Sequence, residues 1–109
     1  MTLRMAADGA RLPPSLARQM VTASASARRT SPALATITAS DLSPLLLKVQ
    51  APMGLIWGEA DRTVPARMAS IVTDLRPDAE LVLVRDAGHV PMLEWPREFN
   101  HLVLEFIAR

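Results

Sequence analysis

The sequence of 109 residues contains no cysteine. This absence excludes a disulfide framework, a thiolate nucleophile and a zinc-thiolate site, and it leaves the redox compartment open. Aromatic side chains are scarce, since the chain has just Trp57, Trp95, Phe99 and Phe106. No apolar run approaches the roughly 18 residues that a membrane-spanning helix needs. We therefore expect no membrane segment.

The net charge is also close to zero, at +1, because the 12 basic side chains are nearly balanced by 11 acidic ones. Six basic and two acidic residues give +4 over residues 1–48, whereas six basic and nine acidic residues give −3 over residues 49–109. The basic residues of the first half are dispersed, with no aromatic among them, so nucleic-acid binding is not expected. Residues 1–10 lack the apolar stretch of a signal peptide, which predicts a cytoplasmic protein.

At 11.9 kDa, the chain can form one small domain at most. Its first half is rich in Ala, Ser, Thr and Arg, and three short helices are expected there. They run from Pro14 to residue 28, from Ser31 to Ile37, and from Asp41 or Ser43 to Lys48. The first carries a thin apolar stripe of Leu16, Met20 and Val21, so it needs a surface to pack against.

The second half gives sharper signals. Residues 53–57 are an unbroken apolar run between Pro52 and Gly58, which predicts a strand buried on both faces, and residues 81–84 predict a second. Strands of that kind occur in parallel sheets that helices cover on each side, so the expected fold class is α/β. One helix is predicted from Pro65 to Leu75 and another from Pro96 to Ile107.

Two parallel strands joined by one helix leave two open edges, and these two strands are apolar on both faces. The sheet is therefore expected to be incomplete. A missing N-terminal part, a partner chain or a second copy of this chain would supply the further strands.

Asp61 and His89 each follow one of the two predicted strands. The carboxyl ends of neighbouring parallel strands are where α/β sheets place their sites. An aspartate that binds one imidazole nitrogen fixes the tautomer and leaves the other nitrogen as a general base. Taken singly, Asp61 is better explained as a loop cap and His89 as a polar loop residue, but their joint placement favours a catalytic pair.

Two stretches together resemble the C-terminal third of an α/β-hydrolase. They are residues 51–65, APMGLIWGEADRTVP, and residues 87–96, AGHVPMLEWP. The resemblance covers about residues 42–109 and implies that Asp61 is the acid and His89 the base of a catalytic triad. It also implies a structural role for Glu94, and it implies no cofactor and no metal. Residues 1–41 are expected to be the end of a cap with its connecting helices.

The family places a nucleophilic serine in a Gly-x-Ser-x-Gly turn upstream of the acid. None of the four glycines of this sequence flanks a serine at that spacing, and the oxyanion loop is absent too. We therefore expect a hydrolase of an ester or similarly activated carbonyl compound that is represented by its C-terminal part and is inactive alone. A small-molecule substrate would bind once the missing part is present. The alternatives are a non-catalytic module that pairs through an open sheet edge, and a remnant without function.

Three smaller questions stay open at this level. His101 with Glu94, Glu98 and Glu105 suggests a metal site, although a solvated polar face explains these residues better. Trp57 is more readily a core residue than a pocket wall. Met92 and Leu93 either line a pocket or pack under the last helix.

Overall fold

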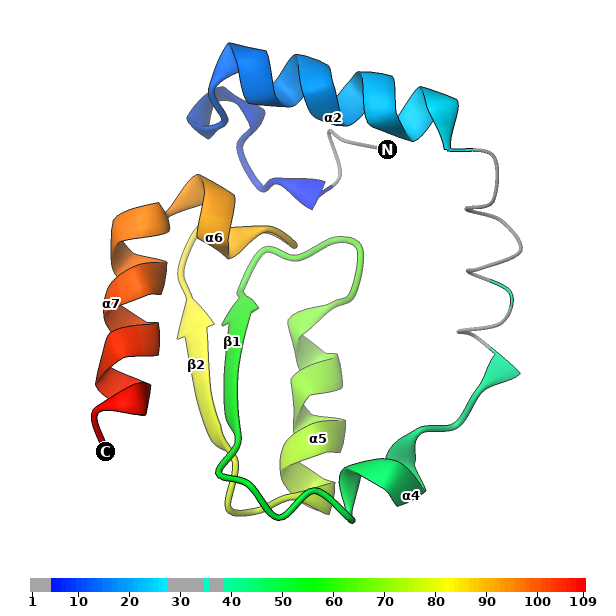
Figure 1. Cartoon of the computed structure of the whole chain (residues 1–109), viewed down its shortest axis with the longest axis vertical. Helices are drawn as coiled ribbons and strands as arrows, with labels where there is room; N and C mark the ends of the chain where they lie inside the picture. The colour runs from blue at the N-terminus through cyan, green and yellow to red at the C-terminus, as the bar shows by residue number, and fades with distance from the viewer. Residues whose placement is uncertain (1–4, 28–34, 36–38) are drawn as a thin grey trace.

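The computed structural model describes residues 5–27, 35 and 39–109. The fold consists of a pair of parallel strands with helices of different lengths packed beside them and at one end (Figure 1). In order, the elements are η1 (Gly9–Arg11), α2 (Pro14–Ser26), α4 (Ser43–Leu46), β1 (Gly54–Gly58), η2 (Ala66–Met68), α5 (Ala69–Leu75), β2 (Glu80–Val84), α6 (Pro91–Glu94) and α7 (Pro96–Ile107).

The strands β1 and β2 form a parallel sheet in the described part of the chain, with Gly54 opposite Glu80 and Gly58 opposite Val84. The helices α5 and α7 flank the pair on its two sides, and both strands point towards α6 and α2 (Figure 1). This arrangement confirms the predicted α/β class and the order strand, helix, strand, helix.

The expectation that both strands are buried on both faces is wrong for this chain. Along β2, Leu81 and Val82 are each 37% exposed and Leu83 is 49% exposed, whereas Val84 at the strand end is 1% exposed. One helix on each side of a two-stranded sheet covers too little of it.

Several helix bounds differ from the expected ones. Pro65 precedes a 3-10 turn rather than an α-helix, and α5 begins at Ala69. The helix α2 ends two residues early, at Ser26. Before α4, the Asp41 carboxylate accepts the Ser43 N–H at 3.0 Å. The expectation that Asp41 or Ser43 caps this helix is wrong, because the N-cap residue is Leu42 and no side chain caps it. The helix predicted from Ser31 to Ile37 lies outside the described residues.

The surface that α2 needs is provided by the region after β2. Figure 1 shows α2 lying across the end of the molecule, above α6. Ala6, Leu12 and Val90 form a small buried cluster there, and Met20 and Leu93 pack against it. The other two members of the expected stripe differ: Val21 remains 55% exposed, and Leu16 is half-buried.

Leu93 packs against the same buried cluster, a position that neither alternative for Met92 and Leu93 named, and Met92 is 42% exposed. A second contact joins the N-terminal part to Trp95, the residue between α6 and α7, because the Arg11 guanidinium stacks over the Trp95 ring at 3.6 Å from its centroid.

At the opposite end of the sheet, Arg76 fastens the segment that leads into β1. Its guanidinium donates to the Leu46, Val49 and Ala51 carbonyls and binds both carboxylate oxygens of Asp78, at 2.6 and 2.8 Å. Arg76 is 8% exposed. A planar guanidinium with five donors can satisfy this many acceptors at once, which makes Arg76 the anchor of this end.

Within the described parts of the chain, no helix combines the length and the apolar character that crossing a membrane requires.

Candidate active site

The loops that follow β1 and β2 are bonded directly to each other. The Glu59 N–H donates to the Val84 carbonyl at 2.9 Å, and the Ala60 N–H donates to the Ala87 carbonyl at 2.9 Å. In the second loop, Asp86 lies in the turn that follows β2 and has a φ of 56°, in the left-handed region. These backbone contacts bring the two predicted site residues to one point.

Asp61 and His89 are in contact there. The Nδ1 atom of His89 lies 2.8 Å from the Oδ2 atom of Asp61. The Asp61 side chain is 4% exposed and the His89 side chain 34% exposed. The predicted proximity is confirmed, while the catalytic role of the pair stays a prediction.

The other carboxylate oxygen of Asp61 organises its own loop. Oδ1 accepts the Thr63 N–H at 2.8 Å and the Val64 N–H at 2.9 Å. An aspartate that accepts backbone N–H groups two and three residues ahead is a common turn-forming arrangement. The loop-cap explanation and the histidine-partner explanation are therefore both correct, since each uses a different oxygen.

This division of oxygens orients the imidazole. An ionised carboxylate can only accept hydrogen bonds, so the network assigns the ring proton to Nδ1. Nε2 then keeps its lone pair and can take a proton from a nearby hydroxyl or water. The buried Asp61 carboxylate would stabilise the imidazolium that results.

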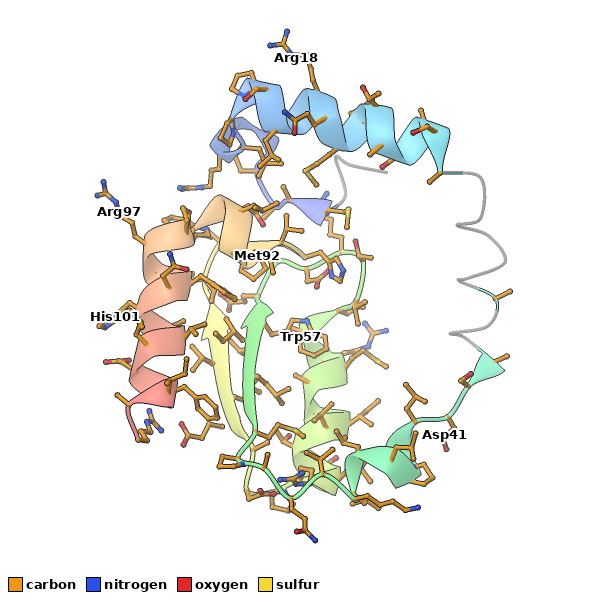
Figure 2. The ribbon with its side chains drawn as sticks, in the orientation of Figure 1. Arg18, Asp41, Trp57, Met92, Arg97 and His101 are labelled. Carbon is orange, nitrogen blue, oxygen red and sulfur yellow. The ribbon has the colours of Figure 1, made fainter. Side chains whose placement is uncertain are left out.

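An open cavity of about 230 Å³ adjoins the pair. It is lined by Ile56, Trp57, Gly58, Asp61, Val64, His89 and Pro91. Figure 2 shows Trp57 beside β1, on the side of α5. Its indole N–H donates to the Val64 carbonyl at 2.9 Å, so Trp57 forms a wall of the cavity as well as packing in the fold. The lining residues described in this structure include no serine.

Glu94 has the structural surroundings that the sequence suggested. Its side chain is buried, and its carboxylate accepts backbone N–H groups from two parts of the chain: Gly88, in the loop after β2, on one oxygen, and Ala7 and Asp8 on the other. The grouping of Glu94 with the acids of α7 around His101 is therefore wrong.

His101 instead pairs with Glu105 one turn along α7, with 3.3 Å between Nε2 and Oε1. Figure 2 shows His101 and Arg97 pointing away from the sheet. Among the residues that the structure describes, no three His, Asp or Glu side chains are grouped so that they could hold a metal ion.

Sequence reasoning missed the segment that lies against His89. The His89 N–H donates to the Met5 carbonyl at 2.5 Å. This bond joins two backbone groups that are 84 positions apart, by their residue numbers. No side-chain pattern marks such a contact, so nothing in the sequence could have revealed it.

Comparison with curated proteins gives matches to part of the chain. One is a 2-hydroxy-6-oxononadienedioate/2-hydroxy-6-oxononatrienedioate hydrolase of Klebsiella pneumoniae, 38% identical over 69 residues, which are 63% of this chain and 24% of that protein. Another is a pimeloyl-[acyl-carrier protein] methyl ester esterase of Yersinia pseudotuberculosis, 30% identical over 67% of this chain and 28% of that protein. The chain thus spans about a quarter of the length of these relatives. No protein-family model matches it.

Comparison with solved structures likewise gives matches in which this chain covers only part of the other protein. An α/β-hydrolase from a Medee basin deep-sea metagenome matches with a TM-score of 0.59 and 30% identity, over 63% of this chain and 25% of that one. A bacterial membrane phospholipase A matches with a TM-score of 0.78 and 26% identity, over 95% of this chain and 34% of that one. The second match extends over the N-terminal part, including the region of α2.

Proposed function

Because the chain is similar in sequence and structure to part of the α/β-hydrolase family, we propose that it supplies the acid and the base of a hydrolase active site. The observation that carries this proposal is the contact between Asp61 and His89 at the carboxyl ends of neighbouring parallel strands. The turn formed by the Thr63 and Val64 N–H groups would explain one carboxylate oxygen of Asp61, but it would not require an imidazole on the other.

The substrate class we propose is an ester or a similarly activated carbonyl compound. A serine hydroxyl from outside these 109 residues would attack the carbonyl carbon, and its proton would move to Nε2 of His89. His89 would then pass that proton to the departing alkoxide or enolate. In the second half of the reaction, water would attack the acyl carbon and give one proton to Nε2. The bond between that carbon and the serine oxygen would then break, and Nε2 would return the proton to the serine oxygen as the acid leaves. Asp61 would hold the Nδ1 proton throughout.

We further propose that the chain is inactive alone. In a Ser-His-Asp enzyme, loss of the nucleophile costs about a millionfold in turnover. A general base without a nucleophile or oxyanion donors contributes about a hundredfold to ten-thousandfold at most.

Reconstitution tests this proposal. The chain is mixed with the portion of the Klebsiella relative that it does not match, and hydrolysis of a small chromogenic acetate ester is followed. His89→Ala is compared with His101→Ala, which changes the exposed histidine of α7. In the mixture, we expect His89→Ala to lower the rate by at least about a thousandfold and His101→Ala to leave it unchanged.

Two results would contradict the proposal. If the mixture hydrolyses the ester equally well with His89→Ala, the pair has no catalytic role. If the chain alone hydrolyses it in a manner that depends on His89, the inference of inactivity is wrong.

A second candidate function is a non-catalytic module that binds a partner strand or a second copy of the chain. The exposed apolar residues of β2, Leu81 and Leu83, favour it, because an open strand edge beside such residues can pair with another chain. This alternative predicts a stable oligomer in sedimentation experiments. It also predicts that Asp61→Asn and His89→Ala leave the association intact, and a folded monomer would exclude it.

A further inference from the structure

Glu94 joins residues 7 and 8, near the start of the chain, to the loop after β2. Its Oε1 atom accepts the Ala7 N–H at 2.7 Å and the Asp8 N–H at 3.3 Å, and its Oε2 atom accepts the Gly88 N–H at 2.8 Å. Glu94 itself is 4% exposed. A carboxylate this deeply buried needs several donors, and here backbone N–H groups supply them.

The segment that Glu94 holds lies directly against the site. The Met5 carbonyl accepts the His89 N–H at 2.5 Å. A Cβ atom added to Gly88 would come within 2.5 Å of the Ala7 nitrogen and 2.7 Å of the Met5 oxygen. Two successive backbone N–H groups are therefore fixed, that of Gly88 by Glu94 and that of His89 by the Met5 carbonyl.

We propose that Glu94 is a positioning residue for His89. Its carboxylate clamps residues 5–8 onto the loop after β2 and so holds the imidazole within hydrogen-bond distance of Asp61. This inference rests on the proposed function, in which His89 is the base. A general base that is displaced by about an ångström loses much of its catalytic effect. Glu94, which binds two segments at once, would prevent such a displacement of His89.

Both oxygens of the carboxylate are needed for this role. In Glu94→Gln, the single amide oxygen can serve either Gly88 or the pair Ala7 and Asp8, and the amide NH₂ then faces an N–H donor on the other side. The variant keeps the size of the side chain but releases one segment. Glu94→Asp keeps the charge, but it is one methylene shorter and cannot span the same gap.

The test is proton NMR of the full chain, which observes the Nδ1–H of His89 in its hydrogen bond to Asp61. In Glu94→Gln, we expect this proton to exchange with water faster by about tenfold or more, or to lose its downfield signal. Glu94→Asp should change it in the same direction. Glu98→Gln, the same substitution at an exposed position of α7, should leave it unchanged. The His101 ring in the same spectra is the internal reference.

Each outcome decides between the explanations. If both Glu94 variants fold and the His89 signal is unchanged, Glu94 contributes to stability alone and the proposal is wrong. Loss of folding in both variants would lead to the same conclusion. Asp61→Asn separates this from the proposed function: if that variant also leaves the His89 signal unchanged, the acid–base pair itself is wrong.

Discussion

Gly58 and Gly88 lie so close together that a Cβ atom on Gly58 would overlap the Gly88 carbonyl oxygen. One residue ends β1 and the other belongs to the loop after β2, so this approach sets the separation of the two loops that carry Asp61 and His89. Neither glycine has a positive φ, so their small size rather than their backbone freedom is what the structure uses.

We therefore predict that Gly58→Ala is strongly destabilising. The added Cβ would meet backbone atoms, which cannot move away by changing rotamer as a side chain can. Overpacking of this kind lowers the free energy of unfolding by about 1 to 3 kcal/mol. The matched control is Gly54→Ala at the other end of β1, where the added Cβ meets the Phe106 ring at 3.1 Å and the ring can shift. Urea unfolding measures both. A Gly58→Ala variant as stable as Gly54→Ala would show that the loops separate at little cost.

Asp61→Asn is expected to switch the tautomer of His89. The asparagine oxygen would take the place of Oδ1 and accept the Thr63 and Val64 N–H groups, which leaves its NH₂ facing Nδ1. Nδ1 would then be the acceptor and Nε2 would carry the proton. Ring ¹⁵N shifts report this switch directly, and the reconstituted activity should fall by about ten-thousandfold.

The matched control is Asp74→Asn, at an exposed position of α5. It should change neither the ring shifts nor the rate. Unchanged ring shifts in Asp61→Asn would mean that the carboxylate does not select the tautomer.

Arg76→Ala should destabilise the chain by about 1.5 to 3 kcal/mol, because the carbonyls of residues 46–51 lose a buried charged donor. Arg76→Lys should rescue little of this loss, since an ammonium cannot reproduce the planar contacts. The control Arg67→Ala is at an exposed position and should stay within about 0.5 kcal/mol of the wild type. Chemical unfolding midpoints provide the comparison. If Arg76→Lys is as stable as the wild type, the positive charge of Arg76 and not its planar shape is what stabilises the chain.

The pair of Arg76 and Asp78 also predicts a pH dependence. The hydrogen bonds from Arg76 hold the pKa of the Asp78 carboxyl below its ordinary value of 3.8. The contribution of Asp78 is therefore complete above that value and is lost as the pH falls through the lowered pKa of the folded protein. The stability difference between the wild type and Asp78→Asn should narrow as the pH falls from about 5 towards about 2. A difference that is constant over this range would contradict the prediction.

The sequence was sufficient for the framework of the fold and the two residues of the candidate site. The apolar run ending at Trp57 and the helical spacing of Phe99 and Phe106 are strong local signals, and parallel strands bring their carboxyl ends together. From these features, the meeting of Asp61 and His89 followed by geometry alone.

The remaining contacts had no such signal. Glu94 binds backbone N–H groups 86 and 87 positions away, and every residue except proline offers an identical N–H, so no residue type marks the partner. Arg76 likewise binds carbonyls of the linker. The exposure of Leu83 escaped prediction for another reason, because an apolar residue in a sequence does not reveal how completely the rest of the fold covers it.

The two tryptophans of the sequence are attached to different parts of the molecule. Trp57 donates a hydrogen bond to the Val64 carbonyl beside the candidate site, whereas Trp95, between α6 and α7, stacks against Arg11 of the N-terminal segment. The chain consequently carries two native fluorophores that can be observed one at a time. In Trp95→Phe, the fluorescence of Trp57 remains and reports on what enters the cavity. In Trp57→Phe, the fluorescence of Trp95 remains and reports on whether the N-terminal segment, blue in Figure 1, stays packed against it.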